Sequence, residues 1–317
     1  MKTRVAVIGA GYMGGGIAQV MALAGCDVQL GDIDADTARA SRERLIAQAA
    51  AYVERGYFAP DAEERCAEGI HAAASVEAAV DAADMVEEAV PEVLAIKQET
   101  LKRISSAAPP EAVIGSNTST ISIGMMAEFV YQPERFLGIH FSNPAPFIPG
   151  VEVIPHAQTD QAAVDSAMAL LERCGKVGVQ VKDVTGFVLN RLQYALFSEA
   201  SRVVEEGVAS VEDIDTIART TFGYRLPFFG PFAIADIAGL DVYEFCYTSL
   251  ASEYPERFQP PAVLTERVAA GQHGLKSGSG FLSTPAEDLS AITEYRDAAY
   301  AEMARILEQL GDPPVTY

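Results

Sequence analysis

The sequence predicts a doubly wound α/β domain over residues 1–184, followed by an all-α domain over residues 185–317. Two observations predict the first domain. Short apolar runs alternate with helical patterns as far as Val181, an order that produces a parallel sheet with helices on both faces. A glycine-rich turn also joins the first apolar run to the first helix. After Val181 helical spacing takes over and no strand pattern appears, which predicts the second domain.

The first element is Val5–Ile8, a short apolar run that indicates a buried strand. Gly9, Gly11 and Gly14 follow with the spacing G-x-G-x-x-G, and an apolar-faced helix continues to Gly25. The first glycine of this motif makes a tight turn, the second lets the backbone approach a pyrophosphate, and the third lets the helix pack closely on the strand. The helix N-terminus offers free N–H groups to the phosphates. The pattern predicts a Rossmann-type dinucleotide site built from Gly9, Gly11, Tyr12, Met13 and Gly14.

The second strand, residues 27–32, ends on a carboxylate at the distance that the dinucleotide motif requires. A carboxylate at Asp32 accepts hydrogen bonds from the ribose hydroxyls of the adenosine and repels a 2′-phosphate. The residues that follow, Ile33-Asp34-Ala35, supply no arginine and add another negative charge. We therefore expect the cofactor to be NAD and not NADP.

The remaining elements of the first domain follow from periodicity. Helices are expected at residues 36–56, 76–83 and 93–106, and strands at residues 84–90, 112–115, 136–141 and 150–154. Residues 57–75 show no regular pattern.

In the second domain, residues 184–206 are predicted as one long helix that stops at Gly207. Ser210 and Asp213 resemble a capping box that opens another helix. Because the long helix carries much apolar surface, we expect a homodimer formed through the C-terminal domain.

Composition limits the partners. The formal net charge of −21 argues against nucleic acid and anionic membranes and leaves a small-molecule substrate. No apolar run approaches the ~20 residues of a membrane span. The scattered cysteines have no C-x-x-C spacing, so we expect neither a metal site nor a disulfide framework. The chain enters a strand almost at once, which leaves no room for a signal peptide, and a reduced cytoplasm is the expected location.

His140 ends a predicted strand, on the side where open α/β sheets bind ligands. A histidine there can act as general base in alcohol oxidation, because its pKa lies near working pH. Glu152 starts the next predicted strand and could orient the imidazole if the two strands are neighbours. From spacing alone, a structural role for His140 and a surface position for Glu152 stay open.

Several segments resemble the L-3-hydroxyacyl-CoA dehydrogenases, in family order and over nearly the whole chain. They are Ser116-Asn-Thr-Ser119, Gly138-Ile-His-Phe-Ser-Asn-Pro144, Val151-Glu-Val-Ile154, Asp183-Val-Thr-Gly-Phe-Val-Leu-Asn-Arg191, Gly230-Pro-Phe232, Gly239-Leu-Asp241 and Gly274-Leu-Lys-Ser-Gly-Ser-Gly-Phe281. The resemblance implies that His140 is the base and Glu152 its partner, with Ser119 and Asn190 donating hydrogen bonds to the substrate. It further implies cofactor contacts from Glu92, Lys97 and Asn117.

Other segments are similar to the lambda-crystallin branch, which resembles the L-gulonate 3-dehydrogenases and acts on free 3-hydroxy acids. They are Val90-Pro-Glu92, Ile148-Pro-Gly-Val-Glu-Val-Ile-Pro-His156 and Phe187-Val-Leu-Asn-Arg-Leu-Gln-Tyr-Ala195. The thioester branch holds coenzyme A with a hydroxyl and downstream lysines on the helix after the second strand. Here Ser41 is followed by residues 48–51, Gln-Ala-Ala-Ala, and a basic patch of Arg39, Arg42 and Arg44 is the available replacement. We expect a short-chain 3-hydroxyacyl-CoA as substrate; a free 3-hydroxy acid and a non-catalytic, crystallin-like protein are the alternatives.

Overall fold

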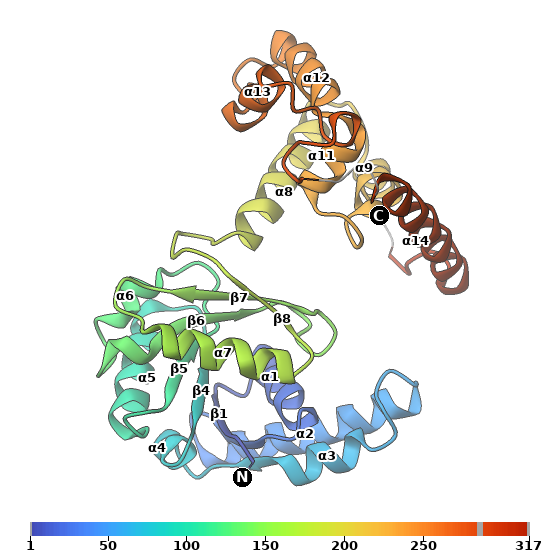
Figure 1. Ribbon diagram of the computed structural model, residues 1–317. Coiled ribbons are helices and arrows are strands. Elements are labelled where there is room, and N and C mark those ends of the chain that lie inside the picture. The colour runs from blue at the N-terminus through green and yellow to red at the C-terminus, as the bar shows by residue number, and fades with distance from the viewer. Residues whose placement is uncertain (1, 284–287, 316–317) are drawn as a thin grey trace. The chain divides into compact units, whose positions relative to one another are not determined.

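The computed structural model describes residues 2–283 and 288–315, and the chain divides into two compact units. The first unit is Met1–Leu196 and the second is Phe197–Tyr317. Figure 1 shows the first as a sheet covered by helices and the second as a group of helices. The predicted combination of a Rossmann-type domain and a helical domain is confirmed.

Within the described residues, one eight-stranded sheet forms the first unit. Its strands are β1 (Arg4–Ile8), β2 (Asp27–Gly31), β3 (Ile70–Ala72), β4 (Met85–Glu88), β5 (Val113–Ser116), β6 (Phe136–Phe141), β7 (Gly150–Pro155) and β8 (Val177–Gln180). They lie in the order β3-β2-β1-β4-β5-β6-β7-β8. Neighbouring strands are parallel except β6 and β7, which are antiparallel. The first six strands therefore have the order of a dinucleotide-binding sheet.

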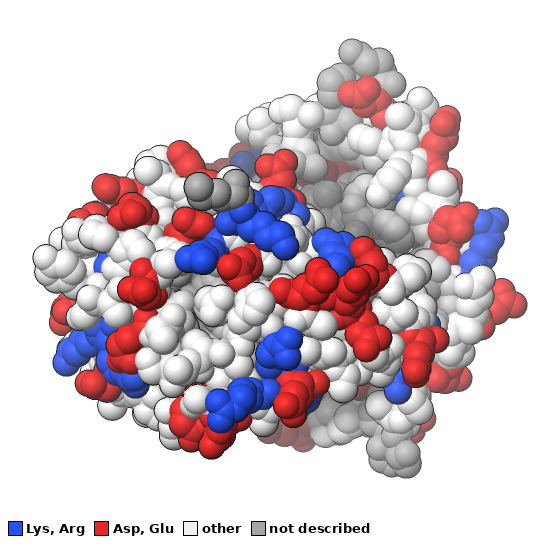
Figure 2. Space-filling model, turned by 90° about the horizontal axis from the view of Figure 1, so that it is seen from below, with Lys and Arg blue, Asp and Glu red and all other residues white. Residues whose placement is uncertain are grey.

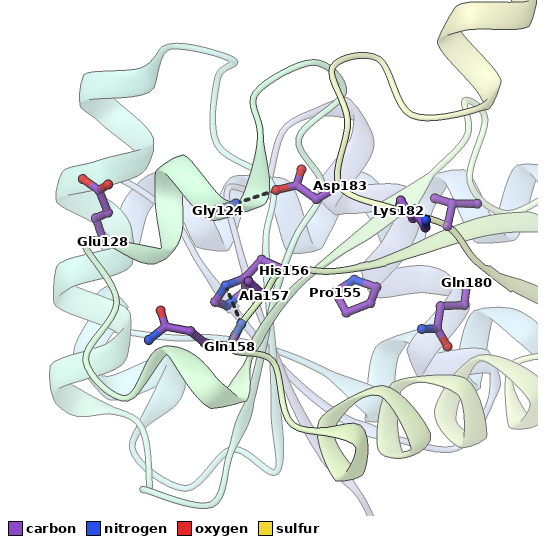
Figure 3. A pocket seen from close by; sticks show the side chains of 10 residues that line it. Gly124, Glu128, Pro155, His156, Ala157, Gln158, Gln180, Lys182 and Asp183 are labelled. Carbon is purple, nitrogen blue, oxygen red and sulfur yellow. Dashed lines mark hydrogen bonds between the residues drawn. The ribbon is translucent and has the colours of Figure 1, made fainter.

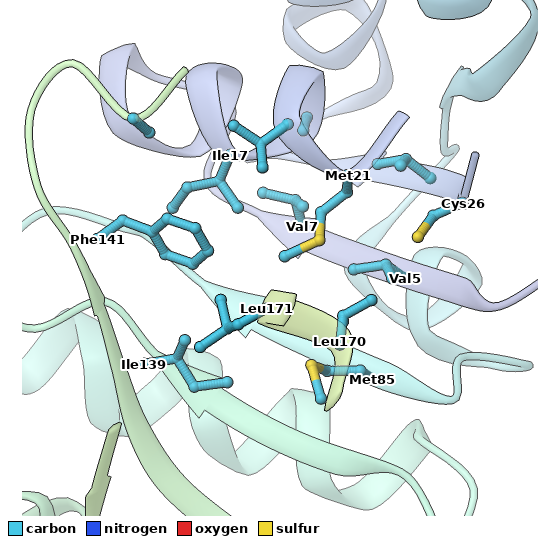
Figure 4. Packing of buried hydrophobic residues seen from close by; sticks show 14 of the residues in the cluster. Val5, Val7, Ile17, Met21, Cys26, Met85, Ile139, Phe141, Leu170 and Leu171 are labelled. Carbon is cyan, nitrogen blue, oxygen red and sulfur yellow. The ribbon is translucent and has the colours of Figure 1, made fainter. Parts of the chain in front are cut away.

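Helices cover both faces of this sheet, as alternate residues of β1 illustrate. The helices are α1 (Tyr12–Leu23), α2 (Ala35–Glu54), α3 (Ala62–Gly69), α4 (Val76–Val80), α5 (Leu94–Ala107), α6 (Ile123–Ala127) and α7 (Gln161–Arg173), with a 3₁₀ turn η1 (Pro133–Arg135). Val5 and Val7 pack in a core with α1, α2 and α7, which Figure 4 shows in part. Ala6 and Ile8 pack in a second core with α4, α5 and α6. Successive side chains of a strand point to opposite faces, so β1 joins the two cores.

Some segments contain elements for which no bounds were predicted. Residues 57–75, expected to be less regular, contain α3 and β3, a strand of only three residues that carries His71. Residues 155–181, within the predicted alternation of strands and helices, contain α7 and β8. β3 and β8 carry too few side chains to show a period.

The long helix of the second domain begins later than predicted. Helix α8 (Leu189–Glu205) starts after a turn in which Gly186 has φ 76° and Phe187 has φ 48°. A right-handed helix requires negative φ, so these two residues cannot belong to it. The predicted start at residue 184 is therefore wrong by the length of this turn.

The second unit is helical in its described residues. Its helices after α8 are α9 (Val211–Thr220), α10 (Phe222–Arg225), α11 (Pro231–Ala238), α12 (Leu240–Glu253), α13 (Ala262–Ala269) and α14 (Leu289–Leu310), with a 3₁₀ turn η2 (Leu275–Ser277). The predicted capping box of Ser210 and Asp213 is confirmed at the start of α9. Ala235, Leu240 and Leu264 form a small buried core.

Asp236 explains one motif of the second unit. Its carboxylate, only 1% exposed, accepts hydrogen bonds from the N–H groups of Phe281 and Leu282 at 3.0 and 2.7 Å. A Cβ added at Gly274 or Gly280 would lie 2.3 or 2.2 Å from an oxygen of Asp236. Gly274 and Gly280 are therefore required by packing.

Charged side chains are mixed on the face of the molecule seen in Figure 2. Lysines and arginines occur there in small groups separated by aspartates and glutamates. This face therefore presents no continuous positive surface, in keeping with a formal net charge of −21.

Glu87 on β4 is a buried acid in the core shared with α1. Its side chain is 1% exposed, and neither carboxyl oxygen has a hydrogen-bond partner among the described residues. Burial, and secondarily the negative charge of Glu88, raises the pKa of Glu87 well above its ordinary value, although Lys97 opposes the rise. The fold therefore favours the neutral, protonated form of Glu87.

This acid predicts a loss of stability with rising pH. Because the pKa of Glu87 is higher in the folded than in the unfolded chain, its effect on the free energy of unfolding is most favourable below the unfolded pKa of about 4.3 and is lost as pH rises towards the folded pKa. We expect Glu87→Leu to raise that free energy by about 1–3 kcal/mol at pH 8 and by less at pH 5. Urea unfolding at both pH values measures this change in the free energy of unfolding, with Glu99→Leu, at an exposed position, as the control. An equal effect at both pH values would contradict the prediction.

Candidate active site

The glycine-rich loop between β1 and α1 is shaped to approach a ligand. Gly9 has φ 98°, a conformation that favours glycine, and a Cβ there would lie 2.7 Å from the backbone of Ala89. A Cβ at Gly14 would lie 1.8 Å from the carbonyl oxygen of Gly9, so α1 packs directly on the turn. Helix geometry leaves the N–H groups of Tyr12 and Met13 without intrahelical acceptors. Donors of this kind can bind a phosphate.

Two side chains hold the peptide groups of Ala10 inside this loop. Asp32 Oδ2 accepts a hydrogen bond from Ala10 N at 2.6 Å, and Arg44 donates one to Ala10 O at 2.9 Å. Oδ1 of Asp32 also accepts from Ile33 N at 2.7 Å. Carboxylate oxygens have about four acceptor sites in total, so Asp32 retains capacity for ribose hydroxyls.

A cleft of about 780 Å³ opens above the loop. It brings together most of the sequence-predicted cofactor residues: Gly9, Gly11, Tyr12, Met13, Asp32, Glu92 and Asn117, together with Ser119. Gly14 lies buried beneath it. Free helix N–H groups and an acid directly after β2, both at the edge of this cleft, fit a dinucleotide.

Lys97, unlike the predicted cofactor residues that line the cleft, lies inside the fold. Its side chain is 1% exposed and does not line the cleft. The ammonium lies 2.8 Å from Glu88 Oε1 and 3.4 Å from Glu92 Oε2. Glu88 in turn accepts hydrogen bonds from Val90 N and Ser116 Oγ. Lys97 also donates to Val90 O at 3.3 Å, and Val90, like Glu92, lines the cleft. A contact of Lys97 with the cofactor stays a prediction.

Glu92 organises the serine loop that follows β5. Its Oε1 accepts hydrogen bonds from Thr118 Oγ1, Ser119 N and Thr120 N at 2.7, 2.8 and 3.0 Å. Burial opposes ionisation, but these hydrogen bonds and the charge of Lys97 together lower the pKa of Glu92 below its ordinary value. The carboxylate is thus ionised at neutral pH and fixes the loop at the edge of the cleft.

His140 and Glu152 form a buried pair beside this loop. They are direct partners in the antiparallel register of β6 and β7, so both side chains point to the same face. His140 Nδ1 lies 2.8 Å from Glu152 Oε2, and Nε2 lies 3.2 Å from Ser119 Oγ. A carboxylate can only accept, so Nδ1 carries a proton, and in the neutral form of the ring Nε2 is the base. The arrangement can accept a proton at Nε2 and stabilise the resulting imidazolium.

The other oxygen of Glu152 holds the segment that starts α8. Glu152 Oε1 accepts hydrogen bonds from Val188 N and Leu189 N at 2.9 and 3.0 Å. Asn190, one residue on, donates from Nδ2 to Ser119 O at 2.8 Å. His140, Glu152, Ser119 and Asn190 are therefore brought together as one connected group.

Sequence reasoning missed three side chains of this site. The ring of Phe187 lies 5.8 Å from that of His140, and Glu88 and Ser116 sit behind the cleft. Phe187 follows Gly186 in a turn, where no periodicity marks it. Glu88 could have been found as an acid inside a predicted strand, since an acid there is costly unless it is paired.

The basic patch expected on α2 is not formed. Arg39 pairs with Asp36, Arg42 donates to the carbonyl oxygens of Ile70 and Ala67 at 2.6 Å each, and Arg44 holds Ala10. The helical period turns these side chains in different directions. The expectation of one patch is corrected, because backbone carbonyls and an adjacent acid engage the three cations.

A second cavity, of about 960 Å³, lies on the same unit near α6 and β7 (Figure 3). Two of its polar side chains are used within the fold. His156 Nε2 is 2.9 Å from Pro133 O, and the Asp183 carboxylate accepts from Ser122 Oγ, Ile123 N and Gly124 N. His156 and Asp183 therefore hold neighbouring loops together.

Comparison with known proteins agrees with this geometry. Residues 4–184 match the family model described as 3-hydroxyacyl-CoA dehydrogenase, NAD binding domain, and residues 186–284 match its C-terminal domain. A probable 3-hydroxybutyryl-CoA dehydrogenase of Bacillus subtilis is 36% identical over 88% of this chain and 96% of its own length. The 5-formyl-3-hydroxy-2-methylpyridine 4-carboxylate 5-dehydrogenase of Mesorhizobium japonicum is 33% identical over 97% of this chain and 99% of its own length. The solved structure of the 3-hydroxyacyl-CoA dehydrogenase of Archaeoglobus fulgidus is 32% identical in sequence and has a TM-score of 0.80. The match covers 96% of this chain and 99% of that chain.

A dinucleotide loop next to a histidine with a free ring nitrogen defines an NAD-dependent oxidoreductase. The chain belongs to the 3-hydroxyacyl-CoA dehydrogenase family, and NAD is its cofactor. Among the described residues, no helix is long and apolar enough to cross a membrane.

The cofactor preference predicts a mutational result. Asp32→Ala removes both the expected ribose acceptor and the acceptor of Ala10 N–H. We expect kcat/KM with NAD to fall roughly tenfold, about 1.4 kcal/mol, and the preference over NADP to shrink. Steady-state kinetics with both cofactors measure the effect. Equal or better use of NADP by the wild type would overturn the assigned role of Asp32.

Proposed function

We propose that this protein oxidises a short-chain L-3-hydroxyacyl-CoA to the 3-oxoacyl-CoA, with His140 as general base. The observation that carries the proposal is the 2.8 Å contact of His140 with Glu152 beside the cofactor cleft. The names of the Bacillus subtilis and Archaeoglobus fulgidus relatives support the thioester substrate.

In this reaction NAD, when bound, accepts the hydride from C3 of the substrate. The hydroxyl proton passes to His140 Nε2 as the C3–O bond becomes a carbonyl. Glu152 Oε2 holds the Nδ1 proton, which fixes the tautomer and stabilises the imidazolium that forms. The proton then leaves to solvent and restores the neutral base.

Ser119 and Asn190 are proposed to hold the substrate oxygen at this base. Ser119 Oγ lies 3.2 Å from His140 Nε2, so one hydroxyl can bridge the base and the reacting oxygen. Asn190 Nδ2 is bonded to Ser119 O and can share its second proton with the substrate. Gly9, Gly11, Tyr12, Met13, Gly14, Asp32, Glu92 and Asn117 are proposed to hold NAD, with Lys97 acting through Glu92.

NADH absorbance with purified protein tests the substrate. We expect turnover of 3-hydroxybutyryl-CoA, with a higher kcat/KM than for free 3-hydroxy acids. Absence of turnover with both substrate forms would favour a non-catalytic protein and overturn the proposal.

A free 3-hydroxy acid is the second candidate, and the arginines of α2 favour it. A coenzyme A ester brings phosphates that need cationic partners, whereas Arg39 and Arg42 are engaged elsewhere. The Mesorhizobium japonicum relative, named for a pyridine carboxylate, matches almost the whole chain. A far higher kcat/KM for a free 3-hydroxy acid would select this candidate.

We further propose a cytoplasmic homodimer with a domain boundary at residue 184. Phe197 on α8 and Val211 and Ile217 on α9 are 68%, 55% and 56% exposed, an apolar surface that a second copy would cover. Light scattering of the full chain tests the dimer. A monomer at micromolar concentration would contradict it.

A further inference from the structure

Lys176 is a buried cation that the mechanism above does not use. It lies between α7 and β8, and the residue is 9% exposed. Its ammonium donates to the carbonyl oxygens of Ala145 and Ile148 at 2.5 and 2.8 Å, and to that of Pro146 at 3.4 Å. No carboxylate lies within ion-pair distance among the described residues. The three acceptors belong to one loop, residues 142–149, which joins β6 to β7.

The composition of this loop explains why it needs an external donor. Pro144, Pro146 and Pro149 have no N–H, so the loop can supply few hydrogen bonds to its own carbonyl groups. The N–H groups of Phe147 and Ile148 both go to Pro144 O, and Val177 N donates to Pro149 O. Lys176 supplies donors to the other carbonyl groups that lie inside the turn. One side chain thus determines how the loop closes.

The closure of this loop affects how β6 pairs with β7, and therefore which residue lies opposite His140. In the β6–β7 ladder His140 pairs with Glu152, and a slip of one residue would turn Glu152 to the opposite face. The loop also packs on α1, where a Cβ at Gly16 would lie 3.1 Å from Pro146 Cδ. Burial of a cation is unfavourable, and it lowers the pKa of Lys176 even though Cys174 opposes the shift. An apolar side chain would avoid this cost but could not bind three carbonyl groups.

We propose that Lys176 is a positioning residue of the active site: by holding the 142–149 loop it keeps Glu152 against His140 Nδ1. This inference rests on the proposed role of the His140–Glu152 pair. The groups that face His140 are Glu152 from β7, Ser119 from the serine loop and the ring of Phe187. Glu92 contacts the same loop, because its carboxylate accepts a hydrogen bond from Ser119 N. Of these, Glu152 is the charge that the 142–149 loop positions.

The test is a titration of the His140 ring by NMR, which needs no substrate. The chain has four histidines, and His140→Gln assigns the signal. Loss of a well-placed carboxylate destabilises the imidazolium, so Lys176→Met is expected to lower the His140 titration midpoint by at least half of the shift that Glu152→Gln causes. Lys182→Met, on an exposed lysine of the following segment, is the matched control and is expected to leave the midpoint unchanged.

Kinetics add a second readout. We expect Lys176→Met to lower kcat by roughly ten- to a hundredfold while KM for NAD stays unchanged. A variant with lower thermal stability but the wild-type His140 midpoint would overturn the inference and leave Lys176 a structural residue. If Lys176→Met does not fold, Lys176→Gln, which has a shorter side chain and fewer donors, decides: a shift of the same sign supports the inference, and an unchanged midpoint overturns it. A wild type that lacks turnover would refute the proposed function without affecting the titration.

Discussion

His140→Gln is expected to lose roughly 10²–10⁴-fold in kcat, the usual contribution of a positioned general base. Glutamine keeps a polar group of similar reach, but it cannot accept a proton at neutral pH. The side chain of His140 is 6% exposed and its Nε2 contacts Ser119, so water cannot easily replace the base. NAD affinity should stay near normal, because His140 does not line the cofactor cleft. Stopped-flow rates of NADH formation and NADH fluorescence titration measure the two quantities.

Glu152→Gln is the companion variant. It should cost less than His140→Gln, since the base remains, and it should move the acid limb of the kcat/KM profile to lower pH. The direction follows from the loss of a negative charge beside the imidazolium. Near wild-type turnover in His140→Gln would show that another group is the base.

The sequence alone could predict the cofactor loop with Asp32, but only part of the group around His140. The β1 loop and Asp32 are local in the chain, so spacing alone predicts where their groups meet. The pairing of His140 with Glu152 depends on β7 being antiparallel to β6, in a sheet where every other neighbouring pair is parallel. Alternation of strands and helices cannot show this reversal, because the short loop between the two strands is its only sign.

The direction in which a charged side chain points is the other property that the sequence could not show. Lys97 and Arg42 are both cations on amphipathic helices, where a solvent-exposed head is the ordinary outcome. One pairs with the buried Glu88 and the other with carbonyl groups at the end of α3. The partners of Arg42 are 28 and 25 residues away, and Glu88 lies on another element than Lys97. A linear pattern of charges therefore could not distinguish a ligand-binding cation from one that holds the fold.

Glu88→Gln is expected to lower the free energy of unfolding by about 3 kcal/mol, the low end of the cost of breaking a buried ion pair. Glu88 is 0% exposed and its Oε1 lies 2.8 Å from the ammonium of Lys97, which is 1% exposed. The amide oxygen of a glutamine can accept from Lys97 and Val90 N, but its NH2 group cannot accept from Ser116 Oγ and the charge is lost. Lys97 would be left with Glu92 at 3.4 Å as its remaining acid. That contact, and the option of releasing the lysine proton, keeps the cost from being larger.

Glu87→Gln provides a matched control for this change, because Glu87 precedes Glu88 on β4 and is equally buried. Burial raises the pKa of Glu87, and its carboxyl group has no hydrogen-bond partner among the described residues, so its substitution removes no ion pair. Urea unfolding at pH 7.5, followed by far-UV circular dichroism, should show a large loss for Glu88→Gln and little change or a small gain for Glu87→Gln. NAD affinity should fall only in Glu88→Gln, since Glu88 holds Val90 and Ser116 behind the cleft. Equal stability of the two variants would show that the Lys97–Glu88 pair contributes nothing beyond its hydrogen bonds.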